Sequence, residues 1–371
     1  MFFKVRFRLT GIIPFLLVLL ITSCTKENYK IETIDGVKIT SNKNVGQNQK
    51  LDLKLTKICT INGDSDSLRY IKRIGRIAFD NENNIYIVDR GQMQIKKYEP
   101  SGKFLKNIGR EGIGPGEFSR LRFLTIQNDT IFAPDLGNND LEKFNLDGDF
   151  YSAKRFDNYR ESPVYPARVR NNYIDDVKIT VEEVIDGESY LLTTHTINLF
   201  DERFNFLKKI KEVEIRTSNS NSMNPNSFFM TIISSDEHVY LATKRAERYQ
   251  IDVLDLEGNV KRIIKNNYKK EKLSDTEKEE IVEEGKRYHI NYKADYKEAI
   301  TSLNIDKSNR LWVKRPNFEG RFHLYDIFEN DIFQKQLDLD FPEHSTLIFI
   351  KDKLVEINEE NKIINIYDYT L

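Results

Sequence analysis

The chain has 371 residues, 39% of them apolar and 31% charged, with a formal net charge of −1. This balance is typical of a folded globular protein and excludes a chain that is mainly disordered. The near-neutral charge argues against a general nucleic-acid binder. Tyrosine and phenylalanine are abundant, with 18 and 23 residues beside one tryptophan, which favours β structure.

The first element in chain order is a predicted signal peptide over residues 1–23. Three basic residues precede an apolar run over residues 11–21, which is too short and wrongly flanked for a membrane-spanning helix. The sequence Ile-Thr-Ser-Cys that ends at Cys24 resembles the bacterial lipobox, whose cysteine is acylated and becomes the first mature residue. Acyl chains on Cys24 would hold the protein to a membrane without a transmembrane helix. The alternative is an ordinary secretory signal that leaves Cys24 free.

Removal of the signal peptide leaves 54 cationic and 58 anionic side chains. Residues 24–49, rich in Asn, Lys and Gly, are predicted to form a flexible tether. No aspartate stands at the second mature position, so the sequence carries no signal for retention in the inner membrane. We therefore expect a protein of the cell envelope, anchored at the outer membrane. Cys59, the one other cysteine, is predicted to be an inert core residue.

A repeat organises the rest of the chain. Residues 77–104 align with residues 124–150 at a fixed offset of 46, which places Asp89 on Asp135. Each unit consists of short apolar strands separated by turn residues, the pattern of an antiparallel meander. Further units start near residues 123, 165, 228, 300 and 345, which gives six in total, and the third, residues 165–210, is the least regular.

The last unit supplies only three strands, and residues 50–61 form a free strand at the other end of the chain. Pairing the two would close a ring and remove its exposed edges. The predicted fold over residues 50–371 is therefore an all-β, six-bladed β-propeller closed by an N-terminal strand, and we expect a monomer. A helical insertion over about residues 266–299 is predicted between blades 4 and 5. Its capping box is Ser274 with Glu277 three positions later.

The segment GREGIGPGEF, residues 109–118, has two interpretations. A phosphate-binding loop would need a following helix and a lysine beside its last glycine, and both are absent. A connection between two blades needs only the sharp turns that glycine and proline provide, so we favour this interpretation. Arg110 and Glu117 would still lie on a face that could contact a ligand.

The segments IYIVDRGQMQIKKYEPSGKF, GREGIGPGEF and LWV resemble the NHL-like six-bladed β-propeller lipoproteins of Gram-negative bacteria, over about residues 50–371. Thr243 and Lys314 stand where the aspartate of that repeat would fall, so a function tied to a full ring of aspartates is in doubt. Propellers of this kind include metal-dependent lactonases and lyases with ligands from different blades. The resemblance implies Asp89 and Asp135 as candidate metal ligands. The alternative is that both carboxylates cap loops by accepting backbone amide hydrogen bonds.

No catalytic constellation or cofactor motif is evident, because the five histidines lack metal-binding spacing and no nucleophile elbow occurs. Cations, however, gather in the turns that should share one face of the ring. An acidic glycan or a peptide carboxylate would suit such a face. The alternative is solvated charge that keeps the loops soluble. The candidate ligand-binding residues are Arg90, Arg110, Lys244, Arg245, Arg248, Lys314, Arg315 and Arg321.

The sequence therefore favours a non-enzymatic binding or scaffold module for a glycan, a peptide or an envelope protein. The alternative hypothesis is a metal-dependent hydrolase or lyase with carboxylate ligands at the central pore.

Overall fold

The structure is a computed structural model that describes residues 28–46, 51–64, 69–156, 167–169, 171–186, 188–218, 230–234, 238–243, 245–287, 293–317, 320–350 and 352–371. The predicted signal peptide and Cys24 lie outside these ranges. Over the described part of the chain, no helix has the length and apolar character needed to span a membrane.

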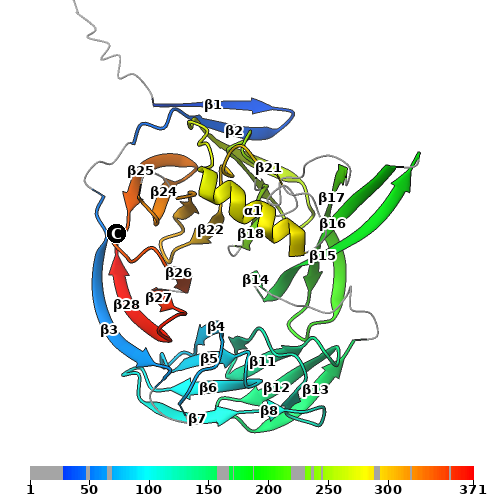
Figure 1. The fold of residues 1–371 in the computed structure, drawn as a ribbon, viewed down its shortest axis with the longest axis vertical. Coiled ribbons are helices and arrows are strands. Elements are labelled where there is room, and N and C mark those ends of the chain that lie inside the picture. The colour runs from blue at the N-terminus through cyan, green and yellow to red at the C-terminus, as the bar shows by residue number, and fades with distance from the viewer. Residues whose placement is uncertain are drawn as a thin grey trace, which may run out of the picture.

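Six sheets surround a central axis, each built on four antiparallel strands, and in every sheet but the closing one the first of these four strands in the chain is innermost (Figure 1). The six-bladed propeller is therefore confirmed, and the sheets begin within a few residues of the predicted positions. The first three complete sheets are β4 (Ile74–Phe79), β5 (Ile85–Asp89), β6 (Gln94–Tyr98) and β7 (Phe104–Ile108); β10 (Thr125–Gln127), β11 (Thr130–Asp135), β12 (Asp140–Asn145) and β13 (Phe150–Arg155); β14 (Ala167–Val169), β15 (Asn172–Ile185), β16 (Glu188–Phe200) and β17 (Phe206–Ser218).

The next two sheets and the closing sheet complete the ring. Their strands are β18 (Met230–Ser234), β19 (Val239–Thr243), β20 (Gln250–Leu254) and β21 (Val260–Asn266); β22 (Ser302–Ile305), β23 (Leu311–Lys314), β24 (Leu324–Glu329) and β25 (Ile332–Asp338); β26 (Ser345–Ile350), β27 (Lys353–Asn358), β28 (Ile363–Thr370) and β3 (Lys54–Asn62).

Closure occurs where the sequence predicts it. Strand β3 pairs antiparallel with β28, with Ile61 opposite Ile364 and Thr60 opposite Asn365. The apolar core lies between neighbouring sheets, as in the cluster that joins Cys59 and Ile61 to residues of the β4–β7 sheet. Cys59 is a buried free cysteine whose pKa is raised by burial, so it is a core residue as expected.

The third sheet departs most from the repeat. Strands β15, β16 and β17 have 14, 13 and 13 residues, and this long arm extends beyond the ring (Figure 1). Its length explains why the third unit shows the weakest repeat pattern, since an extended arm does not keep the spacing of the compact sheets.

The predicted flexible tether is wrong for residues 29–42. They form the hairpin of β1 (Tyr29–Ile34) and β2 (Val37–Asn42), and β2 pairs in parallel with β21, so the hairpin adds two strands to this sheet and β1 becomes its edge. The Asn42 side chain is buried, donates to the Asp331 carbonyl at 3.0 Å and accepts from the Phe333 amide at 2.9 Å. These contacts hold the hairpin on two sheets at once.

The insertion contains helix α1 (Asp275–Arg287), and its capping box is confirmed: the Ser274 amide donates to Glu277 at 2.8 Å, and the Glu277 amide donates to Ser274 Oγ at 3.2 Å. The helix lies between the β18–β21 and β22–β25 sheets. Its predicted place between blades 4 and 5 needs correction. Strand β3 belongs to the closing sheet and comes first in the chain, so counting starts there, and α1 lies between blades 5 and 6.

Candidate functional site

One face of the propeller carries the loops that hold most of the predicted site residues. Successive strands of each sheet alternate in direction, so the turn after the second strand and the connection to the next sheet emerge on the same face. The insertion with α1 is such a connection, and in the view of Figure 1 it projects over the inner part of the β18–β21 and β22–β25 sheets.

The glycine-rich segment is a connection between sheets on this face. It forms the short parallel pair β8 (Arg110–Glu111) and β9 (Glu117–Phe118), and Phe118 is fully buried. Gly109 has φ +70°, and a Cβ at this position would collide with the Phe118 ring. Arg110 is 79% exposed and bonds Glu117 at 2.6 Å, which places it in a surface ion pair. The segment therefore turns the chain inward.

Asp89 and Asp135 are both buried and cap loops. Asp89 accepts hydrogen bonds from the amides of Lys72 at 2.9 Å and Arg73 at 3.1 Å. Asp135 accepts from the Ser119 amide at 2.9 Å, with further amide donors in its own turn. Their oxygens are occupied by backbone donors, and the described residues contain no group of three or more side chains arranged to hold a metal ion.

The predicted cations do not form a single group. Arg315 and Arg321 line one cavity, whereas Arg90 lines another. Arg245 and Arg248 are exposed, and Arg248 donates to Gln250 at 2.8 Å. Lys314 is half-buried at the end of β23, and Lys244 lies outside the described residues.

The larger cavity, about 700 Å³, lies at the seam between the β18–β21 and β22–β25 sheets. We call it the basic pocket, because five cationic side chains and one carboxylate line it. Its wall consists of Asn44, Tyr268, Lys269, Lys270, Glu271, Lys272, Tyr296, Arg315, Arg321, Leu324 and Gln336. Lys269, Lys270 and Lys272 are exposed, and in the described chain no carboxylate forms an ion pair with any of them.

The two ends of the insertion form the rim of this pocket. Lys272 forms a β-bridge with Tyr296, and the Lys297 amide donates to the Glu271 carbonyl at 2.9 Å. The Lys297 ammonium pairs with Glu277 of α1 at 2.7 Å and donates to the Asn317 carbonyl at 2.6 Å. The helix is therefore fastened to the strip of chain that carries the three lysines.

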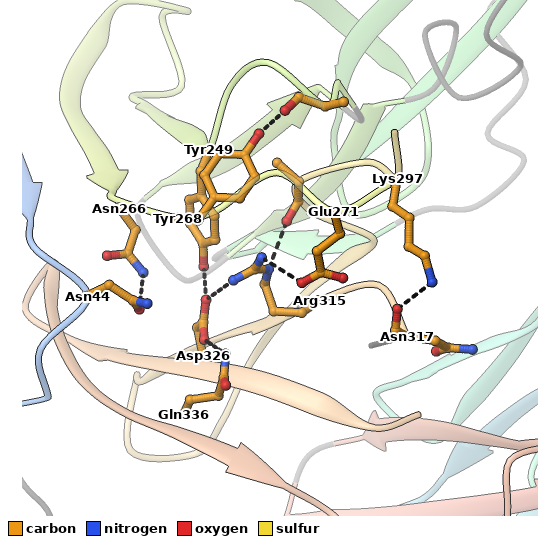
Figure 2. A network of polar contacts seen from close by, with 12 residues as sticks. Asn44, Tyr249, Asn266, Tyr268, Glu271, Lys297, Arg315, Asn317, Asp326 and Gln336 are labelled. Atoms are coloured by element: carbon orange, nitrogen blue, oxygen red, sulfur yellow. Dashed lines mark hydrogen bonds and ion pairs between the residues drawn. The ribbon is translucent and has the colours of Figure 1, made fainter. Parts of the chain in front are cut away.

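Arg315 forms the floor, and Figure 2 shows it among the side chains that neutralise it. It is 5% exposed, and its guanidinium lies over Tyr249 at 5.4 Å and Tyr268 at 5.3 Å. Its Nη1 pairs with the buried Asp326 at 3.3 Å, and its Nε donates to the Ala299 carbonyl at 3.1 Å. These contacts neutralise the charge of Arg315, so its role is to hold the wall of the pocket in place. The rim lysines are the cations that can face a ligand.

Asp326 completes this network. It accepts from the Tyr249 hydroxyl at 2.8 Å and from the Gln336 amide at 2.8 Å. Burial and the Asp326 charge raise the pKa of Tyr249. Burial alone would lower the pKa of Arg315, but the Asp326 carboxylate raises it, so the guanidinium stays charged.

Sequence reasoning did not select the rim lysines. The signal was present as three lysines within the four residues Lys269–Lys272, in the same kind of connection as GREGIGPGEF. The cations were sought only in the turns that follow the second strand of each sheet. The connections between sheets lie on the same face and were left out.

The chain belongs to the six-bladed beta-propeller family DUF5128, whose model matches residues 27–339. Among solved structures it is similar to an exported protein of Bacteroides fragilis, with 14% identity, 90% of this chain and 99% of that chain covered and a TM-score of 0.50. A DUF4221 member from Bacteroides vulgatus gives 11% identity, 86% and 98% coverage and a TM-score of 0.51.

Virginiamycin B lyase from Staphylococcus aureus gives 11% identity, 85% and 99% coverage and a TM-score of 0.46. No curated protein matches the sequence. At these identities the two Bacteroides structures show a common fold alone.

Proposed function

We propose that this propeller is a cell-envelope binding module that takes an acidic glycan in the basic pocket. The observation that carries the proposal is the set of rim lysines, Lys269, Lys270 and Lys272, which are exposed at the pocket and form no ion pair within the described chain. A cavity that is lined by cations and has a low effective dielectric concentrates anions. The volume of about 700 Å³ also falls within the usual range of ligand sites.

The aromatic side chains of the pocket favour a sugar over a simple inorganic anion. Tyr268 and Tyr296 both line it, and Lys270 lies over the Tyr296 ring at 5.4 Å. Tyrosine offers a flat apolar face against which a sugar ring can pack, while the lysines can pair with its carboxylate. A peptide carboxylate would use the lysines but has no need of both rings.

We further propose that lipid at Cys24 anchors the protein in the outer membrane. The lipobox-like sequence before Cys24 supports this, and the structural neighbour from Bacteroides fragilis is described as exported. Because the docked hairpin β1–β2 begins at Tyr29, only a few residues would separate the anchor from the ring. Substitution Cys24→Ser should abolish labelling by radioactive palmitate and release the protein from the membrane fraction. Continued labelling would refute this anchor.

Binding of the mature chain, purified in detergent, to a panel of acidic glycans, neutral glycans and peptides tests the ligand class. We expect acidic glycans to bind and Lys269→Gln/Lys270→Gln to weaken them about tenfold or more. The control Lys103→Gln/Lys106→Gln, which removes two exposed lysines at the outer strand β7, should bind as the wild type does. Preferential binding of peptides, or equal binding by both double variants, would contradict the proposal.

The metal-dependent hydrolase or lyase is not proposed. Its two candidate ligands, Asp89 and Asp135, accept hydrogen bonds from loop amides, and no described contact of either residue favours a metal.

A further inference from the structure

A second cavity of about 280 Å³ lies on the same face, at the seam between the closing sheet and the β4–β7 sheet. We call it the arginine pocket, because Arg76, Arg90 and Arg122 line it together with Phe123. Arg76 lies on the innermost strand β4, Arg90 follows β5, and Arg122 precedes β10. Of these three arginines, the sequence pattern singles out only Arg90.

Arg90 is held in place by the backbone of β4. Its Nε donates to the Ile74 carbonyl at 3.2 Å. A Cβ on Gly75 would come within 2.9 Å of Arg90 Cγ, so glycine lets the arginine lie across the strand. The one carboxylate of the pocket, Glu359, is 4.0 Å from Arg90 Nη2 and 59% exposed. An exposed pair at this distance neutralises little charge.

Arg76 and Arg122 lack a counter-charge among the residues that the structure describes. Within the described chain, no carboxylate lies within ion-pair distance of either guanidinium, and Arg76 rests over the Phe123 ring at 5.0 Å. The Arg76 side chain reaches solvent, yet the surrounding protein removes enough hydration to lower its pKa. A partly desolvated charge without a partner costs stability, which makes it a candidate for ligand binding.

We propose that the arginine pocket binds a small organic anion, with its carboxylate or phosphate on the arginines and its apolar part against Phe123, Ile348 and Ile357. Guanidinium groups bind both oxyanions through paired N–H donors. The apolar side chains supply the remaining wall and favour a ligand with an aromatic or aliphatic body. This site is separate from the basic pocket and does not depend on the function proposed for it.

Calorimetric titration of the mature chain with phenyl phosphate, benzoate and benzyl alcohol tests the proposal. We expect one or both anions to bind, depending on which oxyanion the pocket takes, and the neutral alcohol not to bind. Arg76→Gln and Arg122→Gln should each weaken anion binding about tenfold. Arg155→Gln, which changes an exposed arginine of β13, should leave it unchanged.

Thr346→Glu provides a test that does not remove an arginine. Thr346 is exposed and lines the pocket, so a glutamate there would supply the missing carboxylate from within the chain. We expect loss of anion binding without a fall in the unfolding temperature. Absence of binding by both anions, equal binding of benzyl alcohol, or binding that survives both Arg76→Gln and Thr346→Glu would overturn the proposal.

Discussion

Arg315 and Arg76 are two arginines on one face of the same ring, and they stand in opposite electrostatic conditions. Arg315 lies between two tyrosines and pairs with the buried Asp326 at 3.3 Å. Arg76 has one aromatic neighbour, Phe123, and no carboxylate within ion-pair distance in the described chain. The charge of Arg315 is neutralised within the protein, and its side chain forms part of the wall of the basic pocket. The second keeps its charge available, as a ligand site requires.

The largest expected loss of stability follows from removing the Asp326 carboxylate, which neutralises Arg315. Asp326→Asn keeps the shape but leaves the buried guanidinium with only the more distant Glu271 carboxylate, at 3.8 Å, so the free energy of unfolding should fall by about 3 kcal/mol. Chemical denaturation measures this change. The control Asp140→Asn breaks an ion pair with Arg155, which is 70% exposed, and should cost less than about 1 kcal/mol. Equal losses in the two variants would contradict the structural role of Arg315.

Glu142 gives the corresponding case for an acid, because it is buried and forms no ion pair within the part of the chain that the structure describes. Burial raises the pKa of Glu142 to about 7, although the Gly116 amide donates to it at 3.3 Å. The folded protein therefore holds this proton at pH values where the unfolded chain, with a value near 4.5, has lost it. Stability should fall as pH rises from about 5 to 7.

Glu142→Gln replaces the titrating carboxyl group with an amide that does not titrate. The variant should lose this part of the pH dependence and exceed the wild type by about 2 kcal/mol at pH 8. Denaturation at several pH values checks both effects. If both proteins respond to pH with the same slope between 5 and 7, Glu142 does not carry the effect.

The third prediction concerns Arg76 directly. Arg76→Met removes a charge that has no ion-pair partner among the described residues and keeps an unbranched side chain against Phe123, so the ligand-free protein should become more stable by up to about 1 kcal/mol. Thermal unfolding without added anions measures this change. Lower stability of the variant would show that Arg76 has a structural role after all.

The smallest effect is expected in the glycine-rich connection. Arg110→Gln breaks the ion pair between Arg110 and Glu117. Because Arg110 is 79% exposed, the free energy of unfolding should change by less than about 0.5 kcal/mol. Glycan binding should stay at the wild-type level in the same panel of ligands. A clear loss of binding would return Arg110 to the candidate site.

The sequence predicts the ring well because each blade repeats the same pattern of strands, and a last unit that is one strand short shows how the ring closes. Asp89 and Asp135 hold equivalent places, and the missing last strand indicates the partner of β28. The hairpin β1–β2 could not be predicted in the same way, since its contacts, such as Asn42 with Asp331, join residues 289 positions apart.

The sequence predicted the positive charge of the basic pocket and two of its lining residues, Arg315 and Arg321, but it could not show which arginines the protein itself neutralises. An arginine is neutralised when a neighbouring strand supplies a carboxylate, as β24 supplies Asp326 to Arg315. No local sequence pattern reveals such a pairing. For the same reason Arg76 of β4 and Arg122, in the connection before β10, could not be linked before the fold placed them at one cavity.

Titration of the mature chain with trigalacturonate, at low and at physiological salt, tests whether the basic pocket binds an acidic glycan. We expect binding that weakens as salt rises, because the rim lysines are exposed, and a loss of about tenfold or more in Lys269→Gln/Lys270→Gln. A neutral galactose trisaccharide should not bind. Equal binding of the neutral sugar, or full affinity in the lysine variant, would show that the basic pocket is not an acidic-glycan site.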